Sequence, residues 1–187
     1  AVLSRDKQQA EPTEAIKYAN KAFATFVKYP DMSWEVFDDL LAPVREKSTR
    51  VEQYNRLVLK YEELLRPDLA CEARIKLVEC QVESKDFKKA ADGLARTIRK
   101  FPTEGRYVPK MMEKLQEVCA SYKGGTALLT KFYVQILPQI PPRRGDEVSE
   151  YCVKMYQQAV EFFKKNGQTK EAGVFENQLN RIKSGRS

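Results

Sequence analysis

The spacing of apolar residues constrains this chain more than any other feature. In the stretch SKDFKKAADGLARTIRKFP, the residues Ala90, Leu94, Ile98 and Pro102 recur every four positions. This spacing places side chains on one face of an α-helix, and the proline ends such a helix. Similar stretches follow one another along the chain, and none shows the period of two that a strand requires. The sequence therefore predicts an all-α fold.

The pattern predicts eight or nine helices joined by short connections, so consecutive helices are expected to be antiparallel neighbours. A helix capped by Ser33 is expected to be interrupted at Pro43. The segment PQIPPRRGDE is expected to be a rigid polar connection, with Asp146 capping the helix that follows. The other expected helices span residues 14–28, 51–66, 69–84, 87–100, 108–122, 126–137, 146–165 and 169–183. We expect a flexible N-terminus over 1–11, a single domain over 12–183 and a disordered tail over 184–187.

Composition argues against an enzyme. The 187 residues include no histidine, which removes the commonest general base, the Ser-His and Cys-His nucleophile pairs and the usual zinc sites. Adjacent carboxylates such as Asp38-Asp39 and Glu62-Glu63 point about 100° apart on a helix, so neither pair converges on one site. The net charge of +7 is spread along the chain among acidic neighbours. We therefore expect no catalytic residue, no cofactor and no metal.

The cysteines and the hydropathy indicate a soluble protein of a reducing compartment such as the cytoplasm. No apolar run approaches the 18 residues that a transmembrane helix needs. Cys71, Cys80, Cys119 and Cys152 form no CxxC pair, and we expect them to be reduced and mostly buried. The chain begins at Ala1 rather than Met, which leaves a removed leader open.

Residues 71–104 resemble a tetratricopeptide repeat, a helix–turn–helix unit of 34 residues. The family's positions 7, 20, 24, 28 and 32 are here Leu77, Ala90, Leu94, Ile98 and Pro102, and its aromatic position 17 is Phe87. The unit departs from the family pattern at positions 4, 8, 11 and 15, which hold Arg74, Val78, Gln81 and Lys85.

A second match covers residues 153–186 and is strongest in its first helix. There the signature positions hold Tyr156, Ala159, Phe163, Gly167 and Ala172. The resemblance implies a right-handed α-solenoid of antiparallel helix pairs, in which each unit needs its neighbours to bury enough surface. The alternative is an irregular helical bundle that happens to match these positions.

The resemblance also implies protein binding, because the first helix of each unit in this family lines a groove for a peptide or a partner helix. In the unit at Cys71 the groove positions hold Glu72, Ile75, Glu79 and Val82. In the unit at Val153 they hold Lys154, Gln157, Glu161 and Lys164, with Lys165 beside them. These side chains form either a solvated surface or a groove of mixed apolar and charged character.

The type of ligand can be narrowed further. One branch of the family clamps the C-terminal carboxylate of chaperones with a Lys and an Asn at two groove positions. Those positions here hold Ile75 and Glu79, or Gln157 and Glu161, and a glutamate repels a carboxylate. We therefore expect a protein scaffold that is not a chaperone clamp. The alternative is an RNA-binding helical repeat, although base-reading polar residues do not recur from unit to unit.

The segment LLTKFYVQILPQI poses a separate choice. Phe132, Tyr133 and Ile136 cannot all face one side of a helix. Either this helix is sandwiched between neighbours, or one of its faces is open to a partner.

Overall fold

The computed structural model describes residues 12–42, 44, 47–144 and 147–184. The expected N-terminal segment 1–11, the interruption at Pro43, the cap at Asp146 and the tail residues 185–187 lie outside these ranges. The chain divides into two compact units, Ala1–Asp86 (unit 1) and Phe87–Ser187 (unit 2). The repeat-like segment 71–104 crosses from one unit to the other, so the pairing of its two helices stays a prediction.

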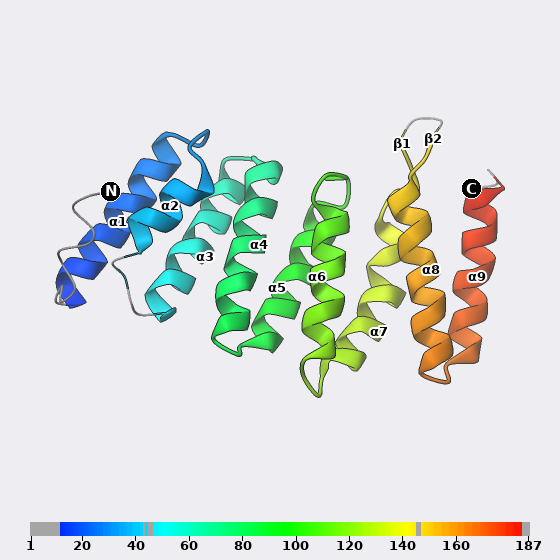
Figure 1. Cartoon of the computed structure of the whole chain (residues 1–187). Coiled ribbons are helices and arrows are strands. Elements are labelled where there is room, and N and C mark those ends of the chain that lie inside the picture. The colour runs from blue at the N-terminus through cyan, green and yellow to red at the C-terminus, as the bar shows by residue number, and fades with distance from the viewer. Residues whose placement is uncertain (1–11, 43, 45–46, 145–146, 185–187) are drawn as a thin grey trace. The chain divides into compact units, whose positions relative to one another are not determined.

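Within the described residues the fold is all-α apart from one very small hairpin, which confirms the predicted class (Figure 1). Unit 1 contains α1 (Pro12–Lys28), α2 (Trp34–Leu41), α3 (Lys47–Glu63) and α4 (Pro67–Glu83). Unit 2 contains α5 (Phe87–Lys100), α6 (Val108–Ala120), α7 (Gly125–Gln135), the 3-10 turn η2 (Leu137–Gln139), β1 (Arg143–Arg144), β2 (Glu147–Val148), α8 (Glu150–Lys165) and α9 (Thr169–Lys183).

The segment expected to be a polar connection is in part an antiparallel hairpin. Strand β1 pairs with β2 in the register Arg143 to Val148 and Arg144 to Glu147. The N–H of Ser149 donates to the carbonyl of Pro142 at 2.9 Å, which closes the hairpin. Helix α8 therefore begins at Glu150 rather than directly after Asp146, and the prediction of its first turn was wrong.

Helices two apart in sequence lie side by side within each unit. In unit 1, α1 contacts both α2 and α3, and α3 packs against α4. In unit 2, α5 contacts α6 and α7, α6 contacts α7, and α8 pairs with α9. Gln116 of α6 also donates to Gln158 of α8 at 3.1 Å. Within each unit, contacts therefore join helices two apart in sequence: α1 with α3 in unit 1, and α5 with α7 and α6 with α8 in unit 2.

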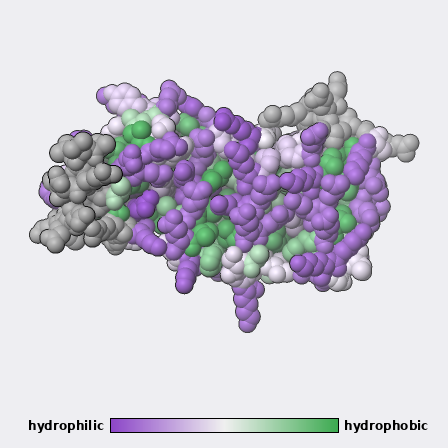
Figure 2. All heavy atoms as spheres, in the orientation of Figure 1, coloured by the Kyte–Doolittle hydropathy of each residue, from purple (hydrophilic) through white to green (hydrophobic). Residues whose placement is uncertain are grey.

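Hydrophilic residues cover much of the face shown in Figure 2, whereas aromatic side chains fill the cores of both units. In unit 1 the ring of Phe26 lies 4.7 Å from Trp34 and 4.8 Å from Phe37. In unit 2 the ring of Phe163 stacks on Phe175 at 5.2 Å. Burial of this kind supplies most of the stability of helices whose ends are weakly capped.

Helix α7 combines both expected behaviours. Phe132 and Tyr133 are each 1% exposed, as a sandwiched helix requires. Val134, on another face of the same helix, remains 48% exposed. The helix is therefore sandwiched on one side and open on another.

One turn recurs after α3, α4 and α8. The second residue after the helix is left-handed in each case, with φ of 54° at Leu65, 60° at Lys85 and 71° at Gly167. The next residue donates its N–H back across the last helical turn, from Arg66 to Tyr61, from Asp86 to Gln81 and from Gln168 to Phe163, at 2.8–2.9 Å. This is the Schellman arrangement, in which glycine is the usual left-handed residue.

A small residue follows each of these turns at the same distance. Ala70, Ala90 and Ala172 lie five residues after the left-handed position, and each is at most 2% exposed. The position that holds glycine in the repeat pattern is thus the one that the backbone requires to be left-handed. The turn between α3 and α4 was not recognised from the sequence as another example, because Leu65 stands at the position where the repeat pattern has glycine.

The cysteines are free thiols, and three of the four are buried. Burial raises the pKa of Cys119 to about 12 and that of Cys152 to about 11. Cys80 is half-buried, and burial raises its pKa as well. None of the helices that the structure describes is both long and apolar enough to cross a lipid bilayer.

Candidate functional site

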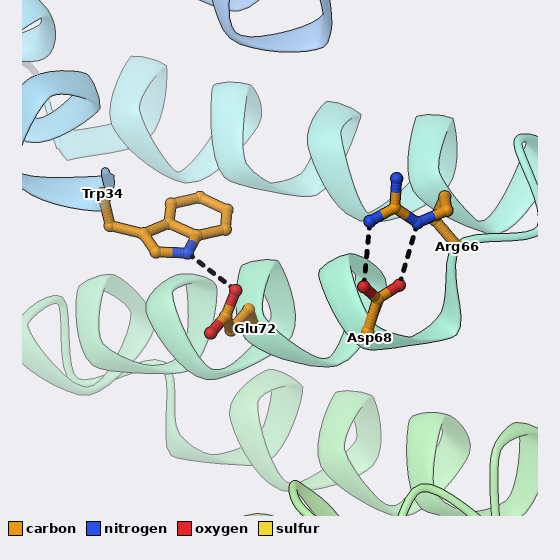
Figure 3. Close-up of polar contacts among 4 residues, drawn as sticks. All are labelled: Trp34, Arg66, Asp68 and Glu72. Atoms are coloured by element: carbon orange, nitrogen blue, oxygen red, sulfur yellow. Dashed lines mark hydrogen bonds and ion pairs between the residues drawn. The ribbon is translucent and has the colours of Figure 1, made fainter. Parts of the chain in front are cut away.

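Side chains of α2 and α4 meet at the surface of unit 1. The indole Nε1 of Trp34 donates to Oε2 of Glu72 at 3.0 Å, and Figure 3 shows the ring reaching from α2 towards α4. Four residues further along both helices, Nζ of Lys76 lies 3.5 Å from Oδ2 of Asp38. These two contacts hold the short helix α2 beside α4.

Asp38 is held from the core side as well. The hydroxyl of Tyr54, from α3, donates to Oδ1 of Asp38. Tyr54 is 1% exposed, and burial raises its pKa, so the phenol stays protonated and remains a donor. Asp38 is therefore a structural acceptor between α2, α3 and α4 rather than half of a carboxylate pair with Asp39, which is exposed.

The predicted groove residues of α4 lie at the edge of solvent. Glu72, Ile75, Glu79 and Val82 are all half-buried. Their spacing of three, four and three residues places them on one side of the helix. Nζ of Lys76 lies 3.9 Å from Glu79. We call the set Trp34, Asp38, Glu72, Ile75, Lys76, Glu79 and Val82 the α2–α4 face.

The face carries an excess of negative charge. Helices α2 and α4 together hold seven carboxylates and two cationic side chains, one of which, Arg74, is 2% exposed. Helices α1 and α3 instead hold seven cationic side chains and four carboxylates. Unit 1 is thus acidic along its even-numbered helices and basic along its odd-numbered ones, although the whole chain has a net charge of +7.

The first turn of α4 is fixed beside this face. Arg66 donates through Nε and Nη2 to the two carboxylate oxygens of Asp68, at 3.2 and 3.0 Å (Figure 3). This pairing holds the pKa of Asp68 below its ordinary value. A carboxylate in the first turn also suits the positive end of the helix dipole. The start of α4, and hence the position of Glu72 one turn later, is well defined.

The predicted groove residues of α8 belong to unit 2 and are all exposed. Nζ of Lys154 pairs with Glu113 of α6 at 2.8 Å, and Nζ of Lys164 pairs with Glu176 of α9 at 3.3 Å. Gln157, Glu161 and Lys165 are likewise exposed. Exposed ion pairs of this kind contribute roughly 0–1 kcal/mol to stability. A partner could therefore break these pairs at little energetic cost.

Three residues of the α2–α4 face, Trp34, Asp38 and Lys76, were not identified as site residues from the sequence. Trp34 was interpreted as part of an apolar helix face and Asp38 as a carboxylate beside Asp39, yet they contact Glu72 and Lys76, nearly 40 residues away. The available signal was the acidic composition of WEVFDDLL and the presence of the chain's single tryptophan at its start. Contact between α2 and α4 depends on tertiary structure, and sequence spacing alone does not reveal it.

In the part of the chain that the structure describes, no group of three or more Cys, Asp or Glu side chains lies close enough together to hold a metal ion.

Comparison with protein-family models, with curated proteins and with solved structures finds no match to this chain.

Proposed function

We propose that this chain is a non-catalytic scaffold that binds a basic, partly apolar segment of a partner protein on the α2–α4 face. The observation that carries the proposal is the composition of that face. Half-buried Ile75 and Val82 alternate with Glu72 and Glu79 beside the half-buried indole of Trp34. Such a surface offers apolar contact and carboxylates to a segment that presents aliphatic and cationic side chains.

The charge of the face selects among peptide ligands. A partner's C-terminal carboxylate would meet the carboxylates of Glu72 and Glu79, so an acidic terminus is disfavoured. Lysine or arginine side chains would instead be attracted to these carboxylates. Electrostatic attraction of this kind raises association rates and weakens as salt increases.

The fold that we propose for the whole chain is a right-handed α-solenoid similar to tetratricopeptide repeats. Two observations support it. Helices two apart in sequence touch within each unit, and the Schellman turn with its buried alanine recurs three times. In repeat proteins, each unit packs mainly on its neighbours and exposes an extended binding surface.

Crosslinking from defined positions tests this function. A photoreactive phenylalanine derivative is placed at Asp39, exposed on α2, and in a second protein at Glu52, exposed on α3. Each protein is irradiated in source lysate, with and without ribonuclease, and crosslinked proteins are identified by mass spectrometry. We expect one protein to crosslink at Asp39, to resist ribonuclease and to crosslink poorly at Glu52.

Charge reversal provides the matched control. The Glu72→Lys/Glu79→Lys variant should lose the crosslinked protein, whereas Glu52→Lys/Glu63→Lys, which changes the net charge equally on α3, should keep it. Equal loss in both variants would show a general charge effect and would count against the α2–α4 face.

A second candidate function, RNA binding, is favoured by helix α5. Its exposed surface carries one carboxylate, Asp92, and five cationic side chains, Lys88, Lys89, Arg96, Arg99 and Lys100. A basic stripe of this kind can bind phosphates without sequence selectivity. Loss of every crosslinked protein on ribonuclease treatment would favour this function over the scaffold.

A further inference from the structure

A groove in unit 2 lies apart from the residues discussed so far. Val134 of α7 and Pro138 of η2 form one side, and Val174, Phe175 and Gln178 of α9 form much of the other. Its volume is about 290 Å³. The two sides come from elements about 40 residues apart in sequence, so the groove depends on the packing of α9 beside α7.

Both sides of this groove carry an apolar side chain that is open to solvent. Val134 is 48% exposed and Val174 is 52% exposed, while Phe175, at 4%, is covered. Two accessible valines that share one concave site form a continuous apolar surface, unlike single exposed side chains scattered over a protein. A branched aliphatic side chain placed between them would remove both from water.

Gln178 adds a hydrogen-bonding requirement to the groove. Its side-chain Oε1 is buried and accepts no hydrogen bond. An unmet buried acceptor is unfavourable, and a donor that reaches it removes this cost. The last torsion of a glutamine side chain is soft, so the amide can turn its oxygen towards a donor in the groove. The occupant should therefore carry an N–H group next to its apolar part.

The charge and the size of the groove limit which ligands can bind in it. Lys170 and Glu171 complete the lining and carry opposite charges, so the groove has no net charge, unlike the acidic α2–α4 face. Its volume is at the lower limit of ordinary small-molecule pockets. Along α9, the lining positions 170, 174 and 178 span two helical turns, about 12 Å at 1.5 Å per residue. These dimensions suit one side chain and the few peptide units around it.

We propose that this groove binds an uncharged peptide segment of a partner protein through one branched aliphatic side chain, with an N–H of the segment donating to Oε1 of Gln178. The site is a second docking point, on unit 2, and its existence does not depend on the α2–α4 face. The segment that it takes is neutral and leucine-like, whereas the α2–α4 face takes a basic one.

A fragment titration tests the proposal with a defined probe. Isovaleramide carries the branched side chain of leucine next to an amide donor, and methyl isovalerate has nearly the same shape but no N–H. Each is added to the isotope-labelled full chain, and methyl and side-chain amide signals are followed by NMR. We expect isovaleramide to shift the methyl signals of Val134 and Val174 and the amide signal of Gln178. The ester should bind about three- to tenfold more weakly, as expected for one lost hydrogen bond.

Variants separate the groove from general apolar binding. Val174→Lys should abolish the shifts at Val134, whereas Val36→Lys, at a valine of α2 that is 41% exposed, should leave them unchanged. Gln178→Leu should remove the preference for the amide over the ester. The proposal is overturned if the probe leaves the Val134 and Val174 signals unmoved up to its solubility limit, or shifts Leu59 and Val36 equally. Equal binding of amide and ester to the unmodified chain would overturn the assigned hydrogen bond.

Discussion

Replacing Leu65 by glycine should leave unit 1 about as stable as before, although Leu→Gly changes usually destabilise. Leu65 has φ of 54°, a conformation that costs a residue with a Cβ about 1–2 kcal/mol. Its side chain is 85% exposed, so it contributes only about 15% of the 1.5–3 kcal/mol of a fully buried leucine, a few tenths of a kcal/mol. Glycine loses roughly 0.5–1 kcal/mol more conformational entropy on folding. These ranges combine to a net change from about 0.5 kcal/mol of destabilisation to about 1.3 kcal/mol of stabilisation, centred on about 0.5 kcal/mol of stabilisation.

Leu59→Gly is the matched control for this change. Leu59 lies within α3, six residues before Leu65, and is 51% exposed. Its replacement removes about half of a leucine's burial and places glycine in a helix interior, which should cost about 2 kcal/mol together. Urea unfolding is followed by the fluorescence of Trp34, the chain's single tryptophan, which reports on unit 1. If both variants lose equal stability, the left-handed turn at Leu65 is refuted.

Three further predictions concern unit 2. A Cβ at Gly125 would lie 1.8 Å from the carbonyl oxygen of Cys119, so Gly125→Ala should destabilise the protein by about 3 kcal/mol or more. A Cβ at Gly173 would have no atom within 4 Å, so Gly173→Ala should stabilise the protein by up to about 1 kcal/mol. Thermal unfolding followed by circular dichroism measures both, and a similar effect of the two changes would contradict the packing at Gly125. Ala172→Leu should lower the urea midpoint by an amount equivalent to about 1–3 kcal/mol, because Ala172 is 2% exposed, and a neutral result would show that this site has room for leucine. Burial raises the pKa of Cys119 to about 12, above that of an unfolded thiol, so its contribution to stability is complete below about pH 8.5 and is lost as the pH rises through 12. The urea midpoint should fall as the pH rises from 8 to 12, and it should fall less steeply in Cys119→Ala. Equal pH dependence in the two proteins would show that the Cys119 thiol does not cause the loss of stability.

The helices themselves were largely predictable from local sequence. The ranges 87–100 and 169–183 match α5 and α9, because their apolar spacing ends at a clear break in each case. The start of α3 was placed four residues late, at Val51 rather than Lys47, because its first turn is polar and carries no apolar signal. Periodicity locates the buried face of a helix well and its polar ends poorly.

The recurring turn was only partly predictable from the sequence. A glycine at 167 revealed the turn between α8 and α9, whereas Leu65 and Lys85 adopt the same backbone without glycine. Tertiary packing on both sides of a turn can stabilise a left-handed residue that local preference disfavours. The turn at Leu65 therefore could not be recognised from the sequence alone.

The candidate sites could be predicted even less, because they join distant segments. Counting charge along residues 1–70 gives a nearly neutral total, since it combines basic α1 and α3 with acidic α2. The acidic surface becomes apparent only when the contact between α2 and α4 brings their carboxylates onto one face. Similarly, sequence spacing did not single out Val134 or Val174, because their groove forms only where α7 and α9 meet.

Hydrogen exchange on the captured complex tests the proposed scaffold function most directly. The chain is exchanged with and without the partner identified by crosslinking, and amide protection is mapped by mass spectrometry. The account predicts added protection in peptides covering residues 34–41 and 67–83, with little change in residues 47–63 of α3. Protection confined to α5, or no added protection in α2 and α4, would contradict the assignment of the α2–α4 face as the binding surface.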